Sequence, residues 1–187
     1  RSGILIRRFD RYIDEHGIAH RLAAEDACQL SNRYPSDKYL LTAEQCSEAL
    51  LTQVFSPRIA APEVFRQFVY AWLTGNGDLH AKNLSIVENR KGQYELSPIY
   101  DIPSTAPYGD KSMALLLSGK KDGLSRRRFL TFAHNIGVSS RVAEHVLEEV
   151  LTGTEHLAEQ AREELPFDSH RMKELLKVLK NRRRSLL

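Results

Sequence analysis

The sequence predicts a mainly α-helical fold with a small β-hairpin near its middle. Three observations lead to this prediction: a long amphipathic helical pattern before residue 75, two short β-prone segments on either side of Lys91-Gly92, and almost continuous helical patterning after Ser125. The chain has 187 residues, of which 42% are hydrophobic and 27% are charged. This composition is typical of a soluble globular domain with one core, and it argues against a disordered chain.

Residues 1–20 predict a strand followed by a connection. The apolar residues 4–6 are expected to form a short buried strand, and a polar connection that contains Gly17 follows them. A buried strand so close to residue 1 is typical of a segment from the middle of a fold. We therefore expect part of the fold to precede this sequence.

Residues 21–74 predict a helical segment. One helix is expected over residues 22–33, and a second over residues 43–54, because Thr42 and Gln45 form a capping-box pattern. The third is expected to begin at Pro62 and to end at Gly75. Its apolar positions recur with helical spacing, which predicts a core helix; they are Val64, Phe65, Phe68, Val69, Trp72 and Leu73.

Residues 75–103 predict a polar loop and a hairpin, and residues 104–187 a helical subdomain. Residues 84–87 and 94–96 are expected to pair across a turn at Lys91-Gly92, and a loop over residues 98–110 follows. After Ser125 we expect helices, with breaks near Gly137, Gly153 and Pro166 and with Asp168 as the N-cap of the last helix.

Charge and cysteine content limit the functional classes. The formal net charge is +3, which does not by itself indicate a nucleic-acid partner, and two cysteines, Cys28 and Cys46, cannot form a disulfide framework. The longest apolar runs are far shorter than a membrane span, so we expect no membrane contact and an intracellular, cytoplasmic protein. Arginine runs at 126–128 and 182–184 fit either solvated helix ends or contact with phosphates or an acidic surface.

The loop after the predicted core helix carries the clearest chemical pattern. Asp78 and Asn83 stand in the order D-x-x-x-x-N, which is the spacing of a kinase catalytic loop. In that chemistry a carboxylate accepts the proton of the attacking hydroxyl, and a nearby amide oxygen binds Mg²⁺ on the nucleotide phosphates. The spacing alone is a weak signal, because ordinary composition often produces it.

A second carboxylate strengthens the pattern. Asp101 follows the predicted hairpin directly, and strand pairing would bring it close to Asn83. The competing interpretation is that Asp78, Asn83 and Asp101 are turn residues that bond their own backbone. His80 and Lys82 lie in the same loop and fit either contacts to phosphate or an ordinary bracing residue and a solvated charge.

With these motifs the sequence resembles the C-terminal region of HipA-like serine/threonine kinases, the toxins of bacterial toxin–antitoxin pairs. The resemblance rests on residues 6–11 (IRRFDR), 75–85 (GNGDLHAKNLS), 96–102 (LSPIYDI) and 113–120. Helical segments at 128–133 and 136–138 continue it, so it covers most of the chain. The implied fold is a protein-kinase-like C-lobe that occupies residues 1–187 as one domain.

The resemblance also implies roles for individual residues. Asp78 resembles the catalytic base, Asn83 and Asp101 resemble the Mg²⁺ ligands, and His80 and Lys82 match the family's catalytic loop. The hinge that holds the adenine of ATP corresponds to Arg7, Arg8 and Phe9. The implied partners are a helix-turn-helix antitoxin that binds operator DNA, and a protein substrate such as an aminoacyl-tRNA synthetase.

The chain departs from the family's pattern in two respects. Arg7 occupies a hinge position where the family often has glutamate. No glycine-rich phosphate loop or N-terminal strand lysine precedes Asp78, so we expect a C-lobe whose N-lobe is absent and which transfers little phosphate by itself. Two other functions stay open. One is a catalytically silent module that docks an antitoxin–DNA complex, and the other is a phosphotransferase that acts on small molecules.

Overall fold

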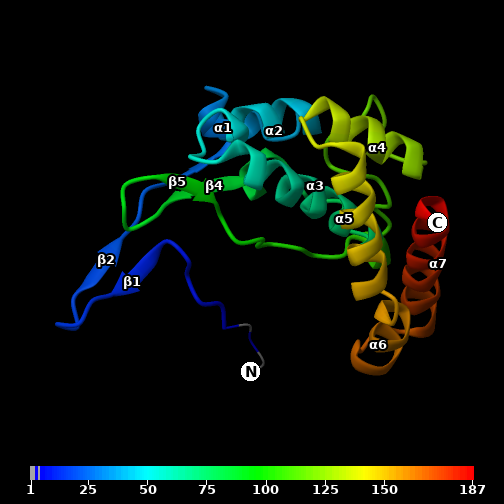
Figure 1. Cartoon of the computed structure of the whole chain (residues 1–187). Coiled ribbons are helices and arrows are strands. Elements are labelled where there is room, and N and C mark those ends of the chain that lie inside the picture. The colour runs from blue at the N-terminus through cyan, green and yellow to red at the C-terminus, as the bar shows by residue number, and fades with distance from the viewer. Residues whose placement is uncertain (1–2, 4) are drawn as a thin grey trace.

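The computed structural model describes residue 3 and residues 5–187, and it confirms a mainly helical fold with small antiparallel sheets. The sheets lie at one end of the molecule, and α4 to α7 gather at the other, with α3 running between them (Figure 1). A two-stranded hairpin, β1–β2, projects from the sheet end.

The strands form two sheets. Their bounds are β1 (Arg11–Ile13), β2 (Ala19–Arg21), β3 (Ala24–Asp26), β4 (Ser85–Glu88) and β5 (Tyr94–Leu96). β1 pairs with β2, and the second sheet has the order β3-β4-β5 with every pair antiparallel. The β4–β5 hairpin is the one that the sequence predicted.

The N-terminal predictions were wrong in three places. The polar connection expected around Gly17 contains the β1–β2 hairpin, and Gly17 lies between its two strands. Of the strand expected at residues 4–6, Ile4 lies outside the described residues, while Leu5 and Ile6 are exposed and belong to no strand. The helix expected over residues 22–33 shrinks to α1 (Ala27–Leu30). The reason is tertiary, because residues 24–26 pair with β4 and Asp26 then caps the helix.

Capping residues set the ends of the two central helices. α2 (Ala43–Leu51) starts at the predicted capping box of Thr42 and Gln45, which confirms that signal. α3 (Pro57–Thr74) begins five residues before the predicted start at Pro62, because Pro57 already occupies its first turn. Gly75 ends α3 in the left-handed conformation that favours glycine.

Four helices complete the chain: α4 (Arg126–Asn135), α5 (Ser140–Gly153), α6 (Leu157–Glu164) and α7 (Ser169–Leu186). Asp168 caps α7, as predicted, by accepting a hydrogen bond from the backbone N–H of Arg171 at 2.9 Å. In the described part of the chain, no helix has both the length and the apolar character that crossing a membrane requires.

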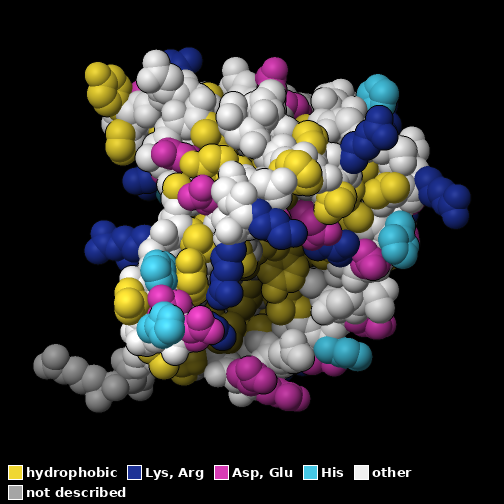
Figure 2. Space-filling view, turned by 60° about the vertical axis from the view of Figure 1, so that its left-hand side comes forward, with side chains coloured by type: hydrophobic (Ala, Val, Ile, Leu, Met, Phe, Trp, Pro, Cys, Tyr) yellow, Lys and Arg dark blue, Asp and Glu magenta, His cyan; other side chains and the backbone are white. Residues whose placement is uncertain are grey.

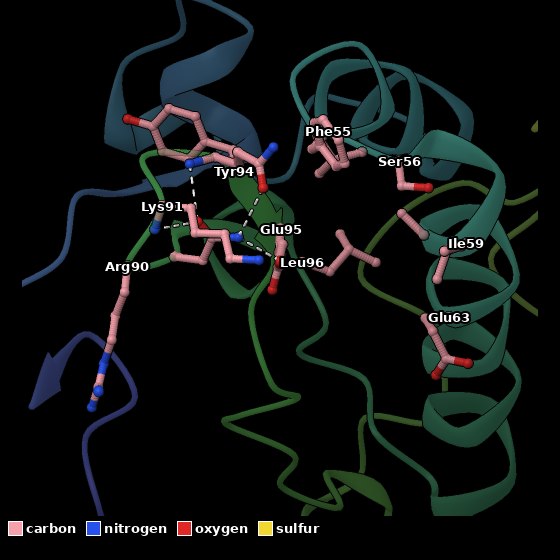
Figure 3. A pocket seen from close by; sticks show the side chains of 13 residues that line it. Phe55, Ser56, Ile59, Glu63, Arg90, Lys91, Tyr94, Glu95 and Leu96 are labelled. Atoms are coloured by element: carbon pink, nitrogen blue, oxygen red, sulfur yellow. Dashed lines mark hydrogen bonds between the residues drawn. The ribbon is translucent and has the colours of Figure 1, made fainter.

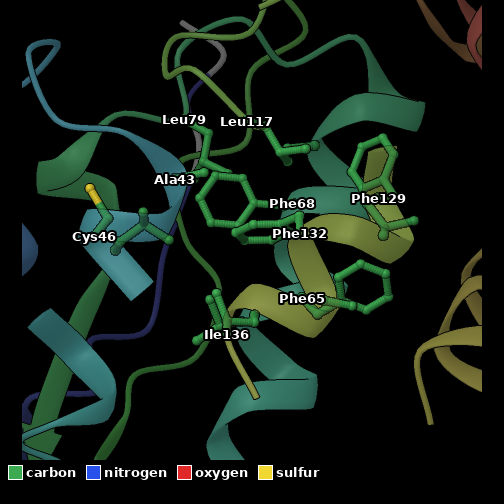
Figure 4. Close-up of a cluster of buried hydrophobic side chains, with 14 of the residues drawn as sticks. Ala43, Cys46, Phe65, Phe68, Leu79, Leu117, Phe129, Phe132 and Ile136 are labelled. Carbon is green, nitrogen blue, oxygen red and sulfur yellow. The ribbon is translucent and has the colours of Figure 1, made fainter. Parts of the chain in front are cut away.

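The core is built around the buried face of α3. Phe65 and Phe68 pack against Phe132 of α4, with ring centroids 6.2 Å and 5.1 Å apart (Figure 4). The Trp72 ring lies 6.4 Å from that of Phe129. These side chains are almost completely buried. Since the polar loop with Asp78 leaves directly from the end of α3, this core fixes where that loop starts.

A buried arginine attaches α7 to this core. Arg182 is 3% exposed and donates hydrogen bonds to the backbone carbonyls of Trp72, at 2.9 Å, and of Lys111. Its guanidinium lies 4.2 Å from the centroid of the Trp72 ring. Burial lowers the pKa of Arg182 to about 10, which still leaves it charged at neutral pH.

We predict that Phe132→Ala lowers the free energy of unfolding by about 3–5 kcal/mol, because it leaves a cavity between α3 and α4. The matched control is Phe55→Ala, whose side chain is 68% exposed and which should change stability by less than about 1 kcal/mol. Urea unfolding followed by circular dichroism measures both. Equal losses for the two variants would contradict the assigned core.

Candidate active site

The polar loop after α3 is locked against the segment that follows the hairpin. The N–H of Gly77 donates to the hydroxyl of Thr105 at 2.9 Å, and the N–H of Thr105 donates to the carbonyl of Gly75 at 3.0 Å. A Cβ atom at residue 77 would lie 2.3 Å from Thr105 Oγ1 and 2.7 Å from the carbonyl of Ser112. Only glycine therefore allows this close approach.

Asp78 is held in place but remains accessible. Its backbone N–H donates to Oδ1 of Asn76 at 2.8 Å, which forms a tight local turn. Its carboxylate oxygen Oδ1 accepts a hydrogen bond from the hydroxyl of Tyr39 at 2.8 Å, and Nε2 of His80 lies 4.0 Å from the same oxygen. The Asp78 side chain is 38% exposed, so a reacting group can reach it.

Asn83 brings the three candidate residues together. It is buried in a short 3₁₀ turn (Ala81–Asn83), and its amide Nδ2 donates to the backbone carbonyl of Asp78 and to Oδ2 of Asp101, both at 3.1 Å. The proximity of Asn83 and Asp101 expected from hairpin pairing is thus confirmed. Because Nδ2 makes both bonds, the Asn83 amide oxygen remains for another ligand.

Asp101 has a strained backbone and follows Tyr100, which is half-buried. Its φ angle is +53°, a conformation that non-glycine residues seldom adopt and that often accompanies functional sites. The hydroxyl of Tyr100 donates to the carbonyl of Lys82 at 2.8 Å, so the Ser85 hydroxyl, 2.6 Å away, is the donor to Tyr100. These bonds fix the chain just before Asp101.

The candidate hinge residues share a cavity with Asp101. The cavity measures about 760 Å³ and is lined by Arg7, Arg8, Phe9 and Asp101 among others, which is a suitable size for a cofactor. The Phe9 ring packs on Tyr100 with centroids 5.5 Å apart, whereas the Arg8 guanidinium is turned to the carboxylate of Asp10 at 2.6 Å. The face shown in Figure 2 has a deep recess with hydrophobic side chains inside and Lys and Arg side chains at its edge.

A second cavity, of about 790 Å³, lies apart from these residues. It lies between the start of α3, with Ile59 and Glu63, and the β4–β5 hairpin, with Lys91 and Leu96 (Figure 3). The eight candidate residues are not among those that line it. Four of them, Arg7, Arg8, Phe9 and Asp101, line the first cavity, and the other four line neither cavity.

His80 and Lys82 are placed differently from each other. His80 is buried edge-on to the Tyr39 ring, with centroids 5.2 Å apart, and burial together with the nearby Lys38 ammonium lowers its pKa below the usual value. The Lys82 side chain is partly exposed and forms no hydrogen bond or ion pair with the described residues. The structure thus brings His80, but not the Lys82 ammonium, into the immediate surroundings of Asp78.

The oxygen atoms of Asn83 and Asp101 fit a hard divalent cation. Among the residues that the structure describes, no three His, Cys, Asp or Glu side chains form a cluster able to hold a metal. A site with one amide and one carboxylate would take its remaining ligands from nucleotide phosphates and water, as Mg²⁺ sites commonly do. The donor set is therefore compatible with Mg²⁺ bound together with a nucleotide.

The sequence did not reveal two contacts of this site. Tyr39 reaches Asp78 across 39 positions, and Tyr100 reaches the carbonyl of Lys82 across 18. Both depend on tertiary packing, and no local spacing indicates them.

Comparison with known proteins identifies the family of this chain. A family model described as HipA-like C-terminal domain matches residues 1–158. Two proteins of Sinorhizobium fredii, named "Putative kinase Y4mE" and "Putative kinase Y4dM", are 32% and 28% identical over 74% and 89% of this chain. A protein of Haemophilus influenzae named "Putative kinase" is 26% identical over 74% of it. The matched regions cover 34%, 40% and 46% of the lengths of Y4mE, Y4dM and the Haemophilus protein.

Two solved structures share the fold. One, from Shewanella oneidensis MR-1, is described as the toxin–antitoxin system HipA, HipB and its operator DNA complex; it aligns with a TM-score of 0.72 and 19% identity over 93% of this chain and 47% of that one. The other is the Helicobacter pylori proinflammatory kinase CtkA, with a TM-score of 0.51 and 15% identity over 89% and 69%.

We predict that Lys38→Met raises the pKa of His80, because it removes a positive charge that disfavours the protonated ring. Titration of the ring by NMR measures the change. Lys120→Met, which removes an exposed lysine from another loop, is the control and should leave the titration of His80 unchanged.

The same shift has a consequence for stability. The pKa of His80 is lower in the folded state than its ordinary value of 6.5, so protonation favours unfolding. The uncharged His80 ring therefore contributes to the free energy of unfolding in full above about pH 6.5. That contribution is lost as the pH falls through the pKa of the folded state. Lys38→Met should reduce the loss, and an identical acid dependence in both proteins would contradict the assignment.

Proposed function

The chain belongs to the family of HipA-like C-terminal domains, and from this premise we propose that it is the C-lobe of an ATP-dependent serine/threonine-protein kinase. The observation that carries the proposal is the convergence of Asp78, Asn83 and Asp101 through the single amide of Asn83, with Asp101 on the wall of a cofactor-sized cavity. This is the arrangement that phosphoryl transfer to a hydroxyl group requires.

In this proposal each residue has one role. Asp78 accepts the proton of the attacking hydroxyl, while the Asn83 amide oxygen and the Asp101 carboxylate hold Mg²⁺. When bound, Mg²⁺ neutralises charge that develops on the phosphates. His80 supports the loop from its buried side, and Lys82 is free to approach a phosphate.

The nucleotide is proposed to occupy the cavity beside the hinge. Arg7, Arg8 and Phe9 line part of its wall, and the loop backbone there can offer hydrogen bonds to adenine. The chain spans a third to a half of the curated relatives that it matches. We therefore assign the remaining phosphate-binding groups to a further part of the complete protein.

The biological setting is also a proposal. The Shewanella structure contains HipA with HipB and operator DNA. By analogy, this chain would serve in the toxin of a toxin–antitoxin pair in the cytoplasm, bind a helix-turn-helix antitoxin, contact DNA indirectly and phosphorylate a protein such as an aminoacyl-tRNA synthetase.

Calorimetry with ATP and Mg²⁺ tests the nucleotide site. We expect clear binding to a protein that carries the full length of the relatives and weak binding to this chain alone. In the longer protein, Asp101→Ala should weaken Mg²⁺-dependent ATP affinity at least tenfold, because one of two protein ligands is lost.

Asp122→Ala is the matched control, because Asp122 is exposed and lies away from the cavity. Unchanged ATP affinity in Asp101→Ala would contradict the metal role. Absence of binding in both lengths of protein would instead favour a silent docking module.

Asp78→Asn in the longer protein should reduce phosphotransfer by about 10²- to 10⁴-fold, because the amide cannot accept the hydroxyl proton. ATP affinity should stay close to that of the wild type, since Asp78 is not a proposed metal ligand. Radiolabel transfer from ATP to a hydroxyl substrate measures the rate, and wild-type turnover in this variant would remove Asp78 from the catalytic role.

A further inference from the structure

Resting on the proposed function, we propose that Tyr39 is a positioning residue that holds one carboxylate oxygen of Asp78, so that the other oxygen faces the acceptor hydroxyl. The Tyr39 hydroxyl donates to Oδ1 of Asp78 at 2.8 Å, across 39 positions of sequence. Oδ2 of Asp78 makes no hydrogen bond with the described residues. The two oxygens of the carboxylate are thus in different environments.

Tyr39 is fixed from several directions. Its ring packs edge-on against the buried His80 ring, with an interplanar angle of 77°, and the Lys38 ammonium lies 4.9 Å from its centroid. The carbonyl of Lys38 accepts a hydrogen bond from the N–H of Ala81 at 3.1 Å, so the two loops are also joined through their backbones. Tyr39 is 43% exposed, and these contacts hold its ring and hydroxyl against the loop that carries Asp78.

The contact suits a base that must be oriented. A carboxylate that accepts a hydrogen bond on one oxygen loses rotational freedom and keeps its charge more readily. The bond to Asp78, followed by burial, raises the pKa of Tyr39, so its hydroxyl stays protonated and continues to donate at neutral pH. Tyr39 is therefore a donor to the base and does not compete with it for the substrate proton.

The test is Tyr39→Phe in the longer protein, with Tyr34→Phe as the matched control. Tyr34 lies in the same loop region, is exposed, and donates no side-chain hydrogen bond to the described residues. We expect Tyr39→Phe to lower kcat by about ten- to a hundredfold, while KM for ATP and the melting temperature stay close to the wild type. Tyr34→Phe should change none of them.

The separation of kcat from KM distinguishes positioning from a structural effect. Loss of the Tyr39 hydroxyl removes the bond that orients Asp78, whereas the nucleotide cavity, which Tyr39 does not line, is unchanged. We therefore expect kcat to fall while KM for ATP stays constant. A variant that is only less stable would instead show a lower melting temperature, with kcat per folded enzyme and KM unchanged.

The outcomes are distinct. Unchanged kcat in Tyr39→Phe, beside an active wild type, would overturn the inference and leave the proposed function intact. Higher kcat in Tyr39→Phe would also overturn it, because it would mean that Tyr39 blocks the acceptor. No phosphotransfer by the wild type to any hydroxyl substrate would overturn the proposed function, and the inference with it.

Discussion

A single buried amide nitrogen, Nδ2 of Asn83, joins the loop that carries Asp78 to the segment that carries Asp101. The candidate metal ligands depend on this donor, because it joins Asn83 directly to the Asp101 side chain. Bonds from Gly77 to Thr105 and from Tyr100 to Lys82 hold the same two segments together on either side of it. A buried amide has few ways to satisfy its hydrogen-bonding capacity, so the position of Asn83 defines the position of both partners. The strained backbone at Asp101 is compatible with such a constraint, since strain persists only where surrounding contacts hold it.

The packing of the loop also determines the electrostatic environment of Asp78. Burial lowers the pKa of His80 and therefore favours an uncharged ring beside the carboxylate. The Tyr39 hydroxyl, for its part, stays protonated. Asp78 thus lies beside a Tyr39 hydroxyl that orients it and a His80 ring that favours the uncharged form, while the Arg8 guanidinium is engaged by Asp10.

The parts of this structure that local patterns encode were predictable. The capping box at Thr42 and the apolar face of α3 each depend on residues three or four positions apart, and both predictions were confirmed. β3 was missed because its partner, β4, lies about 60 residues later, and pairing overrides the helical pattern there. The D-x-x-x-x-N spacing located the loop of the candidate site, whereas the contact from Tyr39 to Asp78 depends on how distant loops pack.

The attachment of α7 by Arg182 has a consequence for synthesis of the chain. Trp72 and Arg182 are 110 residues apart, so at ordinary translation speeds the ribosome adds Arg182 roughly 5 to 20 s after Trp72. During that interval α3 and the loop behind it exist without the helix that anchors them. The nascent chain thus exposes the apolar surface around Trp72, which is a natural binding surface for a chaperone, and the site gains its final support only after release of α7 from the exit tunnel.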